Sequence, residues 1–460
     1  MLRYLATPID LSLPVEQAGI IIPWTQPVDR PSALRFEETE GLVAALGCDL
    51  TFIRAEQVRK PTPGYLLSGG LLERLQLDVA EHNLSMLVMD TSLTPIQQRN
   101  LEQKLGLKVI DRTGLILEIF GLRALTREGR LQVELARLLY ERSRLVRTWT
   151  HLERQRGGRG FLGGPGETQL EADKRMIDRA VQRLRSDLND VRRTRQVQRA
   201  GRQRRDVAMV ALVGYTNAGK SSLFNVLSGA DVMAKDMPFA TLDTTIRKLE
   251  LPDQSAATLV DTVGFISDLP THLIDSFQAT LEETLEADLL IHVRDRASEA
   301  DEAQKQDVLT VLQHLARLNE AELPPMIECW NKADLLNSDQ RQSLQVEAGR
   351  EPSATRPVLV SALSGEGVAE LRLQISQALK AQHLHVFAQL KPEDGALRAW
   401  LHEHAQIESE RYLESGGSAL KVWIDESDWG RLIALYPNQV LEQFRIVTAE
   451  GLKLYDHSTG

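Results

Sequence analysis

One stretch of the chain has the residue types and the spacing that phosphate binding requires. The sequence GYTNAGKS, residues 214–221, fits the pattern GxxxxGK[ST] and lies between the apolar run DVAMVALVG and the helix-like SSLFNVL. Glycines let successive backbone N–H groups converge on phosphate oxygens, and the N-terminus of the following helix adds partial positive charge. Lys220 is placed to reach the β- and γ-phosphates, and the Ser221 hydroxyl to ligate Mg²⁺. The stretch predicts a phosphate-binding loop.

Three further polar segments each follow an apolar, strand-like run. DTVG at 261–264 follows ATLV, NKAD at 331–334 follows PMIECW, and SAL at 361–363 follows PVLV. A carboxylate at the end of the first strand can hold the Mg²⁺ shell, and Gly264 lets a backbone N–H approach the γ-phosphate. A carboxylate in NKAD can accept hydrogen bonds from N1 and N2 of guanine, which adenine cannot offer, and SAL can direct a backbone N–H at guanine O6. A site with such polar groups rejects the wrong base strongly, so the four segments in order predict a guanine-specific P-loop NTPase.

A fifth segment, FATLDTT at 239–245, lies between the phosphate loop and the DTVG segment. A threonine here can ligate Mg²⁺ only when the γ-phosphate is present, which would make the segment a switch. Local chemistry alone leaves Thr241, Thr244 and Thr245 as alternatives.

The group that assists hydrolysis is less evident from the residues. In Ras-like enzymes a glutamine directly after the DxxG glycine orients the attacking water, and here Phe265 occupies that position. Slow intrinsic hydrolysis is expected, with a partner or an ion supplying the missing stabilisation. Asn217 in the phosphate loop is a candidate ligand for K⁺, and the alternative is that it merely suits a tight turn.

The charge of the chain is unevenly distributed. The net charge is −10, but residues 121–206 contain 22 Lys plus Arg against 11 Asp plus Glu, a net of +11, and the remainder carries −21. The average therefore does not exclude nucleic acid, which requires only a local basic surface. The two cysteines, Cys48 and Cys329, are far apart and support no disulfide framework. We see no signal peptide and no run of ~18 apolar residues that could span a bilayer, so we expect a soluble cytoplasmic protein.

The basic segment has the pattern of a helical hairpin. Apolar residues recur at 4-3 spacing, as in a coiled coil, in two series: Leu131, Leu135, Leu138, Leu145, Trp149 and Leu152, then Leu170, Ile177, Val181, Leu184, Leu188 and Val191. The glycine-rich link at 157–166 cannot continue a helix. Arg156, Arg159 and Phe161 at this tip suit contacts with RNA backbone and bases. The alternative is a solvated helix pair joined by a floppy turn.

The flanking regions predict smaller α/β units. Before the hairpin, residues 18–23 and 84–90 read as strands, 34–46 and 96–105 as helices, and 108–120 as a turn followed by a further strand. After residue 381, Gly416 and Gly417 separate a helical run from the strand-like ALKVWID, and Trp400, Trp423 and Trp429 are candidates for the core. The predicted fold is α/β: an N-terminal α/β domain (1–120), the hairpin as a short antiparallel coiled coil (121–205), a P-loop GTPase domain (206–381) and a small acidic C-terminal α/β domain (382–460).

The motifs resemble those of the HflX-type GTPases, in the translation-factor-related class. The resemblance rests on LTPIQQRNLEQKLGLKVIDRTGLILEIF (93–120), TREGRLQVELA (126–136), RQRGGRGFLGGPGETQLE (154–171), GYTNAGKSSLFN (214–225), FATLD (239–243) and DTVGFI (261–266). It covers residues 93–390 closely, whereas residues 1–80 match the family poorly. Thr244 stands where the family commonly has proline, which would leave the switch backbone less restrained.

The resemblance implies a ribosome-associated GTPase that binds the large subunit and splits or rescues stalled ribosomes under stress, with the hairpin tip approaching rRNA near the peptidyl-transferase region. It implies that Thr241 is the switch ligand of Mg²⁺ beside Ser221. With the interpretation of the residues above, the candidates that serve hydrolysis are Lys220, Thr241, Gly264 and, as a K⁺ ligand, Asn217. The residues assigned to GTP or GDP are Gly214, Tyr215, Thr216, Asn217, Ala218, Gly219, Lys220, Ser221, Phe239, Ala240, Thr241, Leu242, Asp243, Asp261, Thr262, Val263, Gly264, Asn331, Lys332, Ala333, Asp334, Ser361, Ala362 and Leu363. The expected ions are Mg²⁺ and K⁺, and the expected state is a monomer.

Two other functions fit the same residues. An RNA-modification or signalling GTPase could use the basic hairpin to bind an acidic protein partner. A nucleotide-gated adaptor without catalysis is suggested by Phe265.

Overall fold

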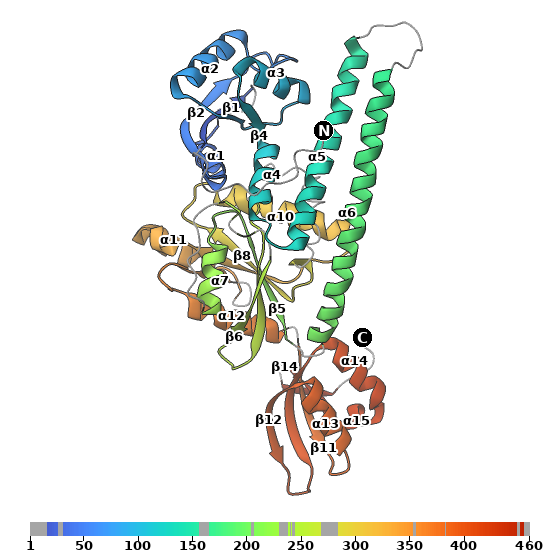
Figure 1. The fold of residues 1–460 in the computed structure, drawn as a ribbon. Helices are drawn as coiled ribbons and strands as arrows, with labels where there is room; N and C mark the ends of the chain where they lie inside the picture. The colour runs from blue at the N-terminus through green and yellow to red at the C-terminus, as the bar shows by residue number, and fades with distance from the viewer. Residues whose placement is uncertain are drawn as a thin grey trace.

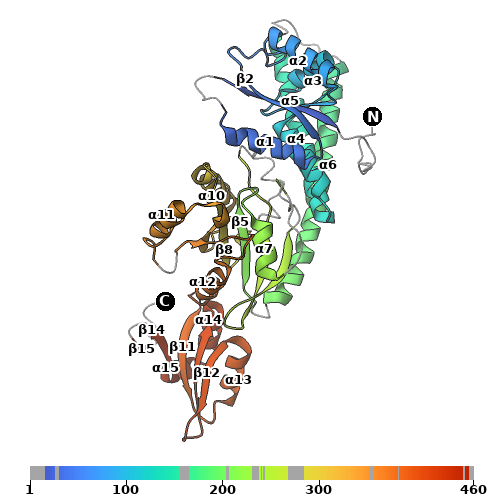
Figure 2. The same cartoon turned by 90° about the vertical axis from the view of Figure 1, so that its left-hand side faces the viewer.

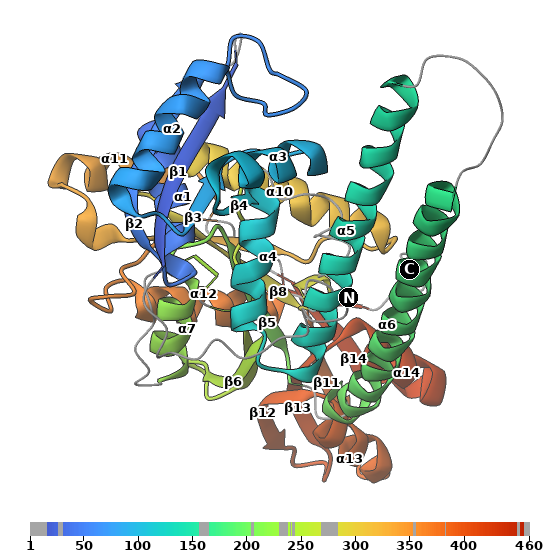
Figure 3. The same ribbon diagram turned by 45° about the horizontal axis from the view of Figure 1, so that its top comes forward.

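The computed structural model describes residues 16–25, 31–155, 165–203, 207–229, 238–239, 241, 244–267, 284–352, 356–381, 383–448 and 451–454. In this part of the chain, three sheets follow one another in sequence, and a long helical hairpin separates the first from the second (Figure 1). Seen from a second angle, the hairpin lies to one side of the first two sheets (Figure 3). The molecule is therefore elongated, with the C-terminal sheet at the end away from the N-terminal one.

The N-terminal unit is a parallel four-stranded sheet in the order β2-β1-β3-β4. Its strands are β1 (Gln17–Trp24), β2 (Asp49–Gln57), β3 (Met86–Met89) and β4 (Lys108–Asp111), and its helices are α1 (Ala33–Ala45), α2 (Gly69–His82), α3 (Pro95–Leu105) and α4 (Arg112–Arg123). The predicted strands at 18–23 and 84–90 and the predicted helices at 34–46 and 96–105 are confirmed. The carboxyl ends of parallel strands meet at one edge of a sheet, which is where ligands and partners dock in such folds.

The prediction of a strand up to residue 120 was wrong. Only β4 is extended, and the run from residue 112 onward is the helix α4. The side chain of Asp111 caps this helix by accepting a hydrogen bond from the backbone N–H of Gly114 at 2.8 Å. Seven residues of α4 are buried, so it is apolar on several faces. An apolar run of this kind cannot be told from a buried strand by periodicity alone.

The hairpin consists of α5 (Arg127–Gln155) and α6 (Pro165–Gln203). Its seam contains the predicted residues Leu135, Val181, Leu184 and Leu188, all buried, with Leu131, Leu138 and Ile177 packed against them. The two helices contact each other and run in opposite directions, as predicted (Figure 1). The tip residues Arg156, Arg159 and Phe161 lie outside the described residues.

The middle unit is a six-stranded sheet in the order β10-β9-β8-β5-β7-β6, in which only β6 is antiparallel to its neighbour. Its strands are β5 (Met209–Gly214), β6 (Thr245–Glu250), β7 (Ala256–Asp261), β8 (Leu289–Asp295), β9 (Met326–Asn331) and β10 (Val358–Leu359). The helices are α7 (Lys220–Ser228), α10 (Asp301–Leu318), α11 (Ser338–Ala348) and α12 (Val368–Ala381), with a 3₁₀ turn η1 (Ala333–Leu335). Four of the predicted nucleotide segments follow β5, β7, β9 and β10, and the segment 239–245 precedes the antiparallel strand β6, so all five lie at one sheet edge.

A single hydrophobic cluster joins the N-terminal and middle units. It contains Ile20 and Phe120 from the first unit together with Val213, Phe239 and Phe265 from the second. Helix α1 lies between the two sheets (Figure 2). Because this core is continuous, the phosphate loop, the segment at Phe239 and the DTVG segment are packed directly against the N-terminal unit.

The C-terminal unit is an antiparallel sheet in the order β12-β13-β11-β14-β15. Its strands are β11 (Leu384–Leu390), β12 (Gln406–Tyr412), β13 (Ser418–Ile424), β14 (Phe444–Thr448) and β15 (Gly451–Leu454), and its helices are α13 (Gly395–His404), α14 (Glu426–Leu435) and α15 (Pro437–Gln443). Trp429 lies in the core and Trp400 packs against it, as predicted. Trp423 instead lies outside that cluster, where its ring stacks on His385 at 3.9 Å.

None of the helices within the described ranges is long and apolar enough to cross a membrane.

Candidate nucleotide site

The phosphate loop connects the end of β5 to the start of α7. Gly214 has φ +154°, and a Cβ there would lie 2.3 Å from the carbonyl oxygen of Val293. Gly219 has φ +90°, and a Cβ there would lie 2.2 Å from Nδ2 of Asn331. Both positions therefore require glycine, one for the approach of β8 and the other for the approach of the NKAD segment.

Lys220 is buried at the first position of α7, with its ammonium folded back over the loop. Its Nζ donates to the backbone carbonyl oxygens of Gly214 at 3.0 Å and Tyr215 at 2.7 Å. Burial lowers the pKa of Lys220 to about 8, although the charge of Asp261 opposes that shift. A buried ammonium in this position is available to phosphate oxygens.

We expect nucleotide affinity to fall above pH 8. The free protein loses the Lys220 proton as pH rises through about 8, whereas bound phosphate stabilises the charged form and raises its pKa. Binding above that pH therefore takes up a proton, and the dissociation constant of GDP should rise by up to about tenfold per pH unit. Titration calorimetry near pH 7 and pH 9, in buffers of different ionisation heat, measures this uptake.

Lys220→Arg is the control for this measurement, because an arginine stays charged throughout the range. It should bind with no proton uptake at either pH. Absence of proton uptake by the unaltered chain near pH 9 would contradict the expected titration of Lys220.

Three oxygens from separate segments meet beside the phosphate loop. The hydroxyl of Ser221 is 2.8 Å from that of Thr241, and both donate to Oδ2 of Asp261 at 2.8 Å. Oδ1 of Asp261 is buried and has no hydrogen-bond partner among the described residues. Burial raises the pKa of Asp261. The charge of Lys220 and the hydrogen bonds from the two hydroxyls lower it, but by less than burial raises it. A carboxylate oxygen left unpaired beside two hydroxyls fits a hard divalent cation such as Mg²⁺.

This geometry distinguishes Thr241 from the other two candidate threonines. Thr241 reaches the cluster, whereas Thr245 is an exposed residue of β6 and Thr244 directly precedes that strand. The neighbouring predicted residues Ala240, Leu242 and Asp243 lie outside the described residues.

The DTVG segment closes the other side of the loop. A Cβ at Gly264 would lie 2.9 Å from Cγ2 of Thr216 and 3.0 Å from Nζ of Lys220. Phe265 follows as a buried residue, and its backbone N–H donates to Gly214 at 3.1 Å while its carbonyl accepts from Thr216 at 2.6 Å. Gly264 therefore lies against the phosphate loop, where a Cβ would press on the ends of the Thr216 and Lys220 side chains.

The two base-recognition segments are joined to each other and to the phosphate loop. Asn331 donates to the carbonyl of Ala218 at 2.8 Å and accepts from the backbone N–H of Ala362 at 3.0 Å. The hydroxyl of Ser361 donates to Oδ1 of Asp334 at 2.5 Å, which orients that carboxylate. Leu363 is 87 % exposed beside them.

Some predicted residues can contribute only through their backbone. The side chains of Phe239, Thr262, Val263 and Ala333 are buried, and the Thr262 hydroxyl donates to the carbonyl of Leu212 at 2.6 Å. Asn217 is exposed with φ +61°, as the tight-turn alternative requires.

Sequence reasoning missed one acidic residue of the site. Asp295 ends β8 and pairs with the ammonium of Lys332 at 2.8 Å. Arg296 next to it lies over the ring of Trp330, 4.4 Å from its centroid. A carboxylate directly after an apolar strand is the same signal that marked Asp261, and it could have indicated Asp295.

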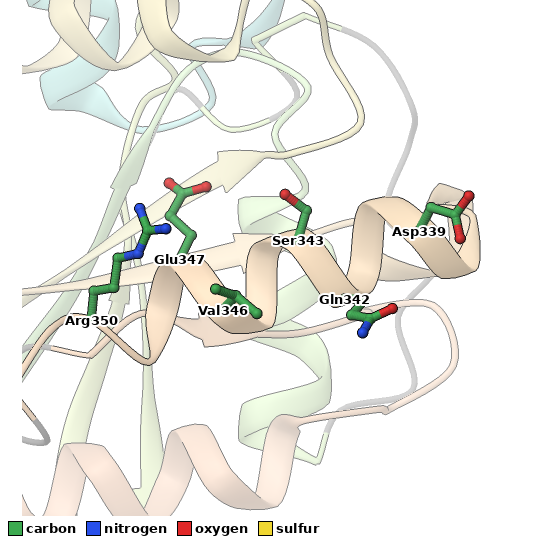
Figure 4. A pocket seen from close by; sticks show the side chains of 6 residues that line it. All are labelled: Asp339, Gln342, Ser343, Val346, Glu347 and Arg350. Carbon is green, nitrogen blue, oxygen red and sulfur yellow. The ribbon is translucent and has the colours of Figure 1, made fainter.

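Two cavities in the described part of the chain lie away from these segments. One of about 550 Å³ is lined by Asp339, Gln342, Ser343, Val346, Glu347 and Arg350 (Figure 4). Because these residues lie on or directly after α11, it is a hollow on one helix. A second, of about 390 Å³, lies between α3, α4 and α5. Among the described residues, no three His, Cys, Asp or Glu side chains lie together as a metal-binding group.

The parallel sheet, the glycine loop and the two base segments define a P-loop GTPase. Three family profiles match in order: "GTP-binding GTPase N-terminal" at 34–121, "GTP-binding GTPase Middle Region" at 123–202 and "50S ribosome-binding GTPase" at 209–332. The first match includes residues 34–80, where the sequence alone showed little resemblance.

Full-length relatives extend this assignment. GTPase HflX of Escherichia coli (strain K12) is 40% identical over 423 residues, covering 92% of this chain and 96% of that protein. GTPase HflX of Magnetococcus marinus is 45% identical over 371 residues, covering 81% and 84%. The chain belongs to the family of HflX GTPases and hydrolyses GTP. The crystal structure of a GTP-binding protein from Sulfolobus solfataricus in complex with GDP matches with 24% identity and a TM-score of 0.45, covering 80% of this chain and 99% of that one.

Proposed function

We propose that GTP closes the switch segment around Thr241, that the closed protein binds the large ribosomal subunit, and that hydrolysis releases it. In this proposal the chain splits or rescues stalled ribosomes under stress. The observation that carries the nucleotide part is the meeting of Thr241 with Ser221 and Asp261 at 2.8 Å. Thr241 lies in the segment between α7 and β6. Its hydrogen bonds therefore connect that segment to Ser221 of α7, directly after the phosphate loop, and to Asp261.

In the proposed site, different residues bind Mg²⁺, bind the phosphates and assist hydrolysis. Ser221 and Thr241 would hold Mg²⁺ directly, and Asp261 would hold its shell through the unpaired oxygen. Mg²⁺ supplies positive charge to the β- and γ-phosphates when it is bound. Lys220 donates to the same phosphates, and the backbone N–H of Gly264 approaches the γ-phosphate. Phe265 is buried and cannot orient water, so a group from a partner or a cation such as K⁺ near Asn217 would complete the site.

The surface of the hairpin supports RNA as the partner. Arg175, Arg179 and Arg183 recur every fourth residue of α6 and are exposed, so they form one basic stripe. Arginine suits phosphates because its planar fork donates two hydrogen bonds at once. Arg156, Arg159 and Phe161 at the tip would extend this stripe into rRNA. The matched family description "50S ribosome-binding GTPase" supports the large subunit as the source of that RNA.

The test compares co-sedimentation with purified large subunits in the presence of a non-hydrolysable GTP analogue or GDP. We expect roughly tenfold more binding with the analogue, and GTP turnover that subunits accelerate in Na⁺ or K⁺ buffer. Arg179→Glu with Arg183→Glu should weaken binding and flatten its salt dependence, because fewer counterions are released.

Arg317→Glu with Arg431→Glu is the matched control, because both arginines are exposed and lie outside the hairpin. Equal sedimentation with both nucleotides would refute the switch. Capture of an acidic protein by the stripe, without affinity for subunits, would favour the signalling alternative.

A further inference from the structure

Four charged side chains of the N-terminal unit form a closed network beside the nucleotide site. Arg35 and Glu38 lie on α1, Asp90 follows β3, and Arg112 begins α4. Arg35 donates to Asp90 at 2.5 Å, and Arg112 donates to Asp90 at 2.8 Å. Arg112 also pairs with Glu38 at 3.0 Å. Two positive and two negative charges balance, and the Asp90 side chain is fully buried, so the network is rigid and costly to disturb.

Ser267, three residues after Gly264, forms hydrogen bonds with this charge network. The Ser267 hydroxyl donates to the Glu38 carboxylate at 3.0 Å. It accepts from Arg35 at 3.1 Å and from Arg112 at 3.2 Å, and Arg112 also donates to the Ser267 carbonyl at 3.1 Å. One small residue of the middle unit is thus held by three side chains of the N-terminal unit.

Tyr215 of the phosphate loop completes the same cluster. Its hydroxyl donates to Glu38 and accepts from the backbone N–H of Ser267, the latter at 2.7 Å. Burial, and then the charge of Glu38, raises the pKa of Tyr215, so the hydroxyl keeps its proton and remains a donor. The phosphate loop, the segment after Gly264 and α1 therefore meet at one tyrosine hydroxyl.

The N-terminal unit also contacts the segment that carries Thr241. The ring of Phe239 packs edge-on against Phe120 of α4, with centroids 4.6 Å apart at 81°. On α1, a Cβ at Gly41 would lie 3.3 Å from the ring of Pro238. These contacts accompany the arrangement in which Thr241 meets Ser221. The N-terminal unit thus packs against both segments that would sense the γ-phosphate.

From these contacts we infer that Glu38, Arg112 and Tyr215 are positioning residues for GTP: they hold Ser267, and through it keep Gly264 where the γ-phosphate binds. The inference rests on the proposed nucleotide site. Contacts that favour the closed arrangement must raise the affinity for GTP relative to GDP, because a ligand and a conformation stabilise each other reciprocally. The N-terminal unit therefore contributes to nucleotide preference without contacting the nucleotide.

The test measures dissociation constants for GDP and for a non-hydrolysable GTP analogue, both with Mg²⁺, in Tyr215→Phe and Ser267→Ala. Each variant removes one hydroxyl and keeps the remaining packing, and Tyr215→Phe keeps the loop backbone, the part of Tyr215 that would face the phosphates. We expect affinity for the analogue to fall about fivefold or more, with affinity for GDP nearly unchanged. Ser267→Thr keeps the hydroxyl and should restore the ratio.

Tyr140→Phe is the matched control, because its hydroxyl donates to Asp111 at 2.7 Å and accepts from Arg144, both in the N-terminal half of the chain. It should leave the ratio unchanged. An unchanged ratio in both test variants, or an equal loss for both nucleotides, would overturn the inference alone. Failure of the unaltered chain to bind either nucleotide would instead overturn the proposed function, and the inference with it.

Discussion

Asp334→Asn should convert the base preference of the site from guanine to xanthine. The Asp334 carboxylate is oriented by Ser361 at 2.5 Å and offers acceptors to N1–H and the N2 amino group of guanine. An asparagine places its NH₂ group against the N2 amino group of guanine, so these two donors face each other and neither has an acceptor. Xanthine carries an oxygen in place of the amino group, so the same NH₂ can donate to it. Affinity for GDP should fall at least ~10²-fold and affinity for XDP should rise by a similar factor.

Fluorescent GDP and XDP analogues measure both constants directly. Asp339→Asn is the control, because Asp339 is an exposed aspartate of α11 near the same edge and lies outside the base segments. It should bind GDP normally. Retained GDP affinity in Asp334→Asn would mean that this carboxylate does not read the base.

The nucleotide segments could be predicted because each is local. The phosphate loop needs a strand, a glycine turn and a helix within a dozen residues, and its requirements at Gly214 and Gly219 follow from that compact geometry. The hairpin was predictable for a similar reason, since a seam at 4-3 spacing is a property of the helix itself. A site or a helix seam formed by residues close together in the chain can therefore be predicted from the sequence.

Features that depend on contacts between residues far apart in the chain could not be predicted from local sequence patterns. The choice of Thr241 over Thr244 and Thr245 depends on which hydroxyl reaches Asp261 in space. The run in α4 reads as a strand until its burial on several faces is known. The Arg35–Ser267 contact joins residues 232 positions apart, and nothing near either residue in sequence indicates the other.

Gly264→Ala should separate GDP binding from GTP hydrolysis. An added Cβ would lie 2.9 Å from Thr216 and 3.0 Å from the Lys220 ammonium, on the side where the γ-phosphate would approach in the proposed site. The effect is spatial, because the backbone of Gly264 does not adopt a left-handed conformation. GDP has no γ-phosphate and should bind within about threefold of the unaltered chain. Turnover should fall about 10²-fold or more, since a backbone donor to the reacting phosphate is displaced.

Single-turnover hydrolysis, with and without large ribosomal subunits, measures this loss alongside the dissociation constant of GDP. Gly395→Ala is the control, because no atom lies within 4 Å of a Cβ at that position at the start of α13. If Gly264→Ala weakened GDP as much as the GTP analogue, the added methyl would be disturbing the whole loop through Thr216. If it left turnover intact, the γ-phosphate would have to be held from another side, and the proposed role of Gly264 would be wrong. Selective loss of turnover is the outcome that places the γ-phosphate between Gly264 and Lys220.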